Sequence, residues 1–142
     1  MSGRKELDLE QWSVAAEWLD RADDDLHAID ILTNAPSPPL KSAALHCQQA
    51  AEKIAKAALV AFASPPPKTH DLDRLGKLVA LQHAELGEQI RSLAGLTAWY
   101  ISARYPEAET EITPSAQQIF AVLNILQSLR ARVQAFAPRD KA

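Results

Sequence analysis

Several polar residues that could do chemistry lie on one expected helix, over about residues 40–63. Polar side chains share one arc of it, because successive helical residues advance by about 100°. They are Ser42, His46, Gln49, Lys53 and Lys56. Hydrogen-bond donors and ammonium groups in this arrangement suit a phosphate or carboxylate ligand. A solvated helix face carries the same residue types, so the spacing alone leaves both interpretations open.

Two further polar features lie later in the chain. Arg104 continues an apolar helix face that includes Leu96 and Tyr100, so it must reach outward, pair with an acid or line a cleft. A buried ion pair and an anion-binding role both fit that position. His70 precedes an expected helix, whose N-terminal amides attract anions, although a histidine at such a place can also simply cap or pack.

Several other chemistries are excluded by missing residue patterns. The four glycines form no phosphate-cradling cluster, which excludes a P-loop or a dinucleotide fingerprint. No Glu-x-x-His or His-Glu-x-x-His spacing supports a di-iron or zinc site, so we expect neither a metal nor a cofactor. Cys47 lies on an apolar helix stripe, where desolvation raises the pKa of a thiol, so we expect it to be structural.

The composition is that of one ordinary globular domain. The chain has 142 residues, 47% of them apolar, a net charge of -3 and one cysteine. No signal peptide or membrane-spanning run is evident, so we expect a cytoplasmic protein that does not bind membranes. Residues 1–33 carry nine acidic and three basic side chains, and we interpret the acidic residues 23–25 as solvated surface.

Apolar residues recur at intervals of three and four, and no alternating strand pattern competes, so the fold class is all-α. We expect an antiparallel bundle of about five helices over residues 12–137, with short flexible ends. The helices are expected to begin near residues 12, 40, 72, 86 and 114. The second is rich in alanine and should be central, because small side chains let neighbouring helices approach closely.

Local signals mark some of the helix ends. Prolines follow the first and second helices and cannot continue them, so the first should end near Thr33. Asp71 or Thr69 is expected to cap the third helix. Thr113 is expected to cap the last helix, with Phe136 among its core residues.

Three stretches of the sequence resemble the motifs of HEPN domains. They are residues 46–57 (HCQQAAEKIAKA), 69–72 (THDL) and 103–106 (ARYP), in the order found in that family. The resemblance extends over about residues 12–135. It implies an all-α bundle of about five helices that is commonly dimeric, with a polar site on the second helix and near the end of the fourth.

The resemblance also bears on activity. HEPN domains are found with minimal nucleotidyltransferases in toxin-antitoxin pairs, and others are metal-independent ribonucleases with an arginine and a histidine separated by four to six residues. After Arg104, the positions for that histidine hold Glu109, Thr110 and Glu111. Without the imidazole there is no obvious group to move protons during attack by a 2'-hydroxyl, so the resemblance does not imply ribonuclease activity.

The polar arc and the motifs together indicate a binding or regulatory subunit with no assigned catalytic residue. We expect it to hold a nucleotide-like anion or RNA, or to be modified by a partner nucleotidyltransferase. The candidate anion-binding residues are Gln49, Lys53, Lys56, His70, Arg104 and Tyr105. Tyr105 is open to two interpretations, as a modification site or as a packing residue.

Alternatives remain for both activity and assembly. One is a ribonuclease whose base is His46 or His70, and another is a helical adaptor without a ligand. A homodimer is expected, with Trp99 as a candidate contact because it shares the back of its helix with the small residues Gly95 and Ser102. Packing of Trp99 against the last helix of the same chain is the other possibility.

Overall fold

The computed structural model describes residues 2–105 and 113–139, with side chains from residue 8 onward. Over these ranges the chain forms helices and no strand, which confirms the all-α prediction. The helices are α1 (Ser2–Thr33), α2 (Leu40–Ala61), α3 (Leu72–Ala80), α4 (Ala84–Arg91), α5 (Leu96–Arg104) and α6 (Ala116–Gln134). None of these described helices has both the length and the apolar character required to cross a bilayer.

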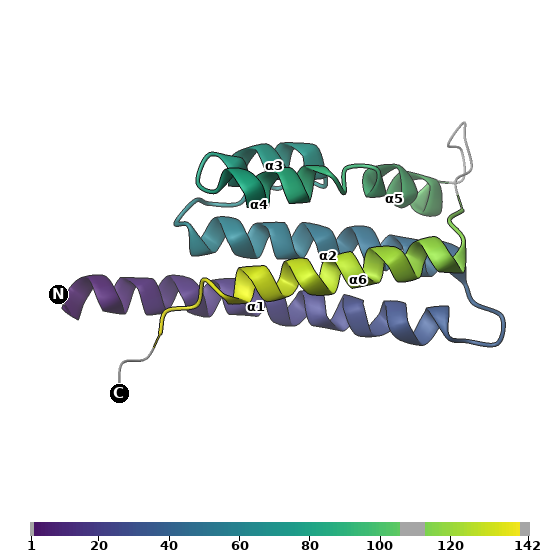
Figure 1. Ribbon diagram of the computed structural model, residues 1–142, viewed down its shortest axis with the longest axis horizontal. Coiled ribbons are helices and arrows are strands. Elements are labelled where there is room, and N and C mark those ends of the chain that lie inside the picture. Colours follow the sequence, from purple (N-terminus) through teal and green to yellow (C-terminus); the bar gives the residue numbers. More distant parts are fainter. Residues whose placement is uncertain (1, 106–112, 140–142) are drawn as a thin grey trace.

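Helix α2 is the centre of the bundle, as its alanine content predicts. It contacts α1, α3, α5 and α6. Figure 1 shows α2 antiparallel to α1, with α3, α4 and α5 along the side of α2 that faces away from α1 and α6 lying across the α1–α2 pair. Alanines fill its contact faces and are fully buried, which lets four neighbours approach one helix. They include Ala43, Ala50, Ala51, Ala55, Ala57 and Ala58.

The helix ends follow local chemistry, with some corrections to the prediction. Helix α1 ends at Thr33 as predicted but begins at Ser2, because no proline interrupts the residues before the predicted start. Asp71 caps α3 as predicted, and its side chain accepts hydrogen bonds from two backbone amides. Helix α6 is capped by Ser115 rather than Thr113, because Ser115 forms a capping box with Gln118.

The predicted fourth helix is interrupted. Helices α4 and α5 are separated by residues 92–95, where amides bond to carbonyls three residues back, as in a 3₁₀ turn. Leu93, within the turn, and Leu96, at the start of α5, are both buried. The apolar stripe that suggested one helix therefore continues across the break. The interruption lets α4 pair with α3 while α5 packs on α2.

Glycine permits the close approach of α3 and α4. A Cβ built on Gly87 would overlap the backbone of Ala80, and one built on Gly76 would overlap Arg91. The α3–α4 hairpin therefore depends on the missing side chains at these positions. It stands beside α2 and, with α2, positions the segment that carries His70.

Candidate functional site

Two residues in the polar arc of α2 face an acid of α1 rather than open solvent. Asp25 is 5% exposed, and its carboxylate accepts hydrogen bonds from His46 Nδ1 at 2.8 Å and from Lys53 Nζ at 2.6 Å. An ionised carboxylate only accepts, so His46 carries its hydrogen on Nδ1. The prediction that residues 23–25 are solvated surface is wrong for Asp25, whose burial is compensated by these two donors.

A second carboxylate, that of Glu52, joins α2 to the segment before α3. Its side chain is 12% exposed and accepts from Lys56 Nζ at 3.1 Å and from His70 Nδ1 at 2.6 Å. Gln48 is fully buried and donates from Nε2 to the His70 carbonyl at 2.9 Å. The backbone and the ring of His70 are therefore both fixed, although its side chain is 62% exposed.

Helix α5 brings two more groups to the same place. The Tyr100 ring stacks on the His70 ring with centroids 5.1 Å apart, and the Arg104 guanidinium carbon lies 5.7 Å from the Tyr100 centroid. Arg104 is exposed and has no carboxylate partner among the described residues. The interpretation of Arg104 as half of a buried ion pair is therefore wrong, because α5 ends at this residue and carries its side chain out of the core.

These contacts form a continuous line, which we call the His70 surface. It consists of Glu52, Lys56, His70, Tyr100 and Arg104. Hydrogen bonds and ring contacts link each member to the next, so the line spans α2, the segment before α3, and the end of α5. Three of the candidates from the sequence, Lys56, His70 and Arg104, are brought together here.

The other candidates lie at the edge of this surface or away from it. Lys53 is turned to Asp25, and Gln49 is half-buried on the same arc of α2. Tyr105 is 45% exposed and forms the C-cap of α5. Both lysines of the arc are thus paired with carboxylates, so neither is the free point charge that the spacing suggested.

Sequence reasoning missed two carboxylates and an aromatic residue in this region. Glu52 could have been found from its spacing to Lys56, since residues four apart on a helix are neighbours. Asp25 lies directly before the buried Leu26, at the edge of the apolar stripe of α1, where an acid needs a partner. Tyr100 was predicted to face the core, and at 7% exposure it does, with His70 and Arg104 against its ring.

The prediction for Cys47 can be compared with the structure. Cys47 is fully buried, and desolvation raises the pKa of its thiol to about 12, as predicted for a thiol on the apolar stripe of this helix. In the part of the chain that the structure describes, no three His, Cys, Asp or Glu side chains are grouped so that they could hold a metal ion.

Trp99 lines an apolar groove between α5 and α6. The groove has a volume of about 230 Å³ and also includes Leu96, Val122 and Ile125. Ile125 is 41% exposed, and a Cβ built on Gly95 would meet open space. Trp99 is therefore partly buried against the core and shares this groove with two residues of the last helix, beside an apolar surface that no described residue covers.

The comparisons with known proteins agree with the motifs. A family model described as the HEPN domain matches residues 15–135, which is most of the chain and includes the whole His70 surface. No curated protein and no solved structure matches the chain. Glu109, Thr110 and Glu111, which stand where a ribonuclease histidine would be, lie outside the described residues.

Proposed function

Because the chain belongs to the HEPN domain family, we propose that it is a binding or regulatory subunit that holds a nucleotide-like anion at the His70 surface. The single observation that supports this most is the exposed Arg104 guanidinium, which lies over the Tyr100 ring without a carboxylate among the described residues. A guanidinium placed in this way keeps its fork of N–H donors available for phosphate oxygens.

The neighbours of Arg104 suit the rest of a nucleotide. The His70 ring is stacked on Tyr100 and fixed by Glu52, yet its side chain is 62% exposed. A flat, fixed and accessible ring is a surface on which a base can stack. In this arrangement the phosphates contact Arg104 and the base lies against His70. The partner that delivers or uses the nucleotide is, in this proposal, a minimal nucleotidyltransferase of a toxin-antitoxin pair.

Binding of ATP to variants of Arg104 tests the proposal. Arg104→Ala should weaken ATP binding at least tenfold in calorimetry, since a charge-assisted pair is worth about 1.5–3 kcal/mol. Arg104→Lys should restore part of the affinity, because an ammonium keeps the charge and loses the bidentate geometry. Arg139→Ala is the matched control, as it removes an exposed guanidinium away from the His70 surface.

Thermal unfolding of the same variants separates binding from structure. Each variant should melt within about 1–2 °C of the parent, since exposed side chains away from packed features contribute little to stability. Arg104→Ala that melts normally and still binds ATP with the parent affinity would contradict the proposal.

A second candidate function is favoured by the Glu52–His70 pair. A carboxylate that accepts from Nδ1 fixes the imidazole tautomer and leaves Nε2 as a base, which is the arrangement of a general base in many hydrolytic sites. This supports a metal-independent ribonuclease with His70 as base, and Asp25 places His46 in a similar pair. RNA cleavage in EDTA that is lost in His70→Gln would favour this function, and no cleavage by the parent would remove it.

We also propose that the subunit is a homodimer formed through the groove beside Trp99. None of the residues lining the groove is charged, which suits a second copy of the same apolar surface on a twofold axis. Ile125→Glu should then separate the dimer, because it places charges against each other in an apolar contact. Light scattering that gives a monomer mass for the parent at micromolar concentration would exclude the dimer.

A further inference from the structure

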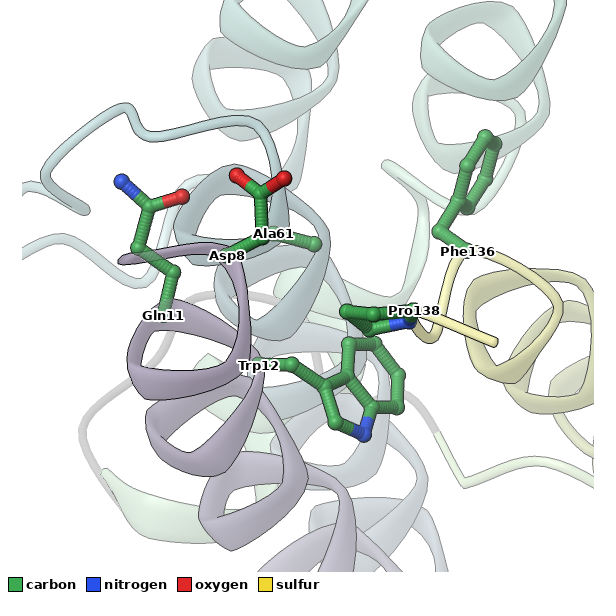
Figure 2. A pocket seen from close by; sticks show the side chains of 6 residues that line it. All are labelled: Asp8, Gln11, Trp12, Ala61, Phe136 and Pro138. Carbon is green, nitrogen blue, oxygen red and sulfur yellow. The ribbon is translucent and has the colours of Figure 1, made fainter. Parts of the chain in front are cut away.

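A hollow of about 250 Å³ lies beside the end of α2 (Figure 2). Its walls come from the start of α1, the end of α2 and the segment after α6. The lining residues are Asp8, Gln11, Trp12, Ala61, Phe136 and Pro138. None of them belongs to the His70 surface, and none was singled out as a site residue from the sequence.

The one charged group of this hollow is negative, and the other polar side chain in its lining is the neutral amide of Gln11. Asp8 is the one charged residue in the lining, and no described side chain pairs with its carboxylate. Ala61 is the last residue of α2, and the carbonyls at a helix C-terminus carry a partial negative charge. No basic residue lies in the last turn of α2 to offset that charge.

The sequence after α2 explains why this negative end stays uncompensated. A continuing helix would donate an amide from position 65 to the Ala61 carbonyl, but Pro65 has no N–H. None of the described backbone amides bonds to the Ala61 carbonyl. The prolines that end α2 therefore leave the carbonyl of a lining residue without a backbone donor.

Aromatic rings complete the lining. Phe136 was predicted to face the core but follows the end of α6 and is 38% exposed. Its ring is nevertheless held edge-on against Phe62 at 5.0 Å and against His83 at 5.5 Å. Trp12 forms the opposite side, with Pro138 beside its indole (Figure 2). The faces of aromatic rings carry negative electrostatic potential, so the aromatic residues of the lining suit the same sign of ligand as the Asp8 carboxylate.

We propose that this hollow binds an organic cation, an alkylammonium group of about the size of trimethylammonium. Aromatic walls together with one carboxylate are the chemistry that recognises such cations. A strongly hydrated metal ion would need several oxygen ligands instead of ring faces. The same group occurs on free molecules such as choline and on trimethylated lysine side chains, so the ligand chemistry is shared by two sources.

The probe is tetramethylammonium chloride, followed through the indole N–H resonances of the three tryptophans. The Trp12 resonance should shift and saturate while those of Trp18 and Trp99 stay in place, with sodium chloride at equal ionic strength as the reference. Asp8→Asn should weaken binding by about two- to fivefold, the range for an exposed ion pair. Glu10→Gln is the matched control, because it removes the same charge two positions away and does not line the hollow.

Further experiments test the role of the ring and distinguish the possible sources of the ligand. Trp12→Leu keeps an apolar side chain but removes both the ring and its reporter resonance, so binding to this variant is measured by calorimetry and should be lost, with a melting curve to show that the variant folds. Choline that binds more tightly than a trimethyllysine peptide identifies a free ligand, and the reverse identifies a protein partner. The proposal is overturned if tert-butanol, an uncharged molecule of similar shape, shifts Trp12 equally, or if tetramethylammonium gives no saturable shift up to about 50 mM, which corresponds to about -2 kcal/mol.

Discussion

Replacing Glu52 by glutamine should destabilise the protein more than its partly polar surroundings suggest. The Glu52 carboxylate is the acid that compensates the Lys56 ammonium, whose side chain is only 9% exposed. Glutamine has nearly the same shape, so the substitution removes the charge without opening a cavity. What remains beside the ammonium is the Trp18 ring, with its centroid 5.5 Å away.

The magnitude follows from how deeply each group is buried. Removing one partner of a buried ion pair costs about 3–5 kcal/mol, because the other charge is left without compensation. The contact of the ammonium with the Trp18 ring offsets about 1 kcal/mol of this cost. Loss of the contact between Glu52 and His70 adds little, because the His70 side chain is 62% exposed. We therefore expect Glu52→Gln to lower the free energy of unfolding by about 2–4 kcal/mol, or the melting temperature by about 6–13 °C.

A double-mutant cycle measured by urea unfolding assigns this cost to the pair. Lys56→Met keeps an apolar chain against Trp18 and should lower the free energy of unfolding by about 1 kcal/mol, since Glu52 keeps its hydrogen bond with His70. The double variant should be more stable than the sum of the single effects predicts, by about 1–2 kcal/mol, because it leaves no buried charge. Strictly additive effects, or a loss below about 0.5 kcal/mol for Glu52→Gln, would refute the reasoning.

Three other outcomes can be checked on the same protein. Cys47, with its raised thiol pKa, should react with a thiol reagent at pH 8 only in denaturant, and rapid reaction of the folded protein would contradict its burial. Gly87→Ala should destabilise by about 3 kcal/mol in urea unfolding because of the overlap with α3, whereas Gly95→Ala, which meets open space, should be neutral or stabilising by up to about 1 kcal/mol. The side-chain hydrogen bond from Lys77 is the main reason that the pKa of Asp73 lies below its usual value. The stabilisation of the fold by Asp73 is therefore present at neutral pH and is lost as the pH falls below about 4. The melting temperature of Asp73→Asn should therefore fall less between about pH 5 and about pH 2 than that of the parent. These two pH values lie about one to two units on either side of the usual carboxyl pKa. An equal fall in the two proteins would contradict this expectation.

The sequence predicted those parts of the fold that depend on neighbours along the chain. Periodicity, prolines and the capping aspartate Asp71 are local signals, and they placed the helices and the central role of α2. The interruption between α4 and α5 was missed because Leu93 and Leu96 both stay buried across it. The pattern of apolar residues therefore does not distinguish a continuous helix from one that is interrupted by a 3₁₀ turn with the same residues buried.

The site was predicted in part, for a comparable reason. Lys56, His70 and Arg104 were singled out from residue type and motif, and they do lie on one surface. Their carboxylate partners depend on how α1, α2 and the segment before α3 lie together, which a single sequence does not specify. Asp25 in particular bonds to His46 and Lys53 only because α1 and α2 pack side by side.

The most direct test of the central claim is to locate nucleotide binding on the molecule. Backbone amide resonances of the isotope-labelled protein should be followed by NMR during titration with ATP at constant ionic strength. The largest shifts are expected on residues 69–72 and 97–105, which carry the rings and the guanidinium of the His70 surface, and Arg104→Ala should remove them. Saturable shifts confined to another face of the bundle, or no shifts at millimolar ATP, would contradict the claim.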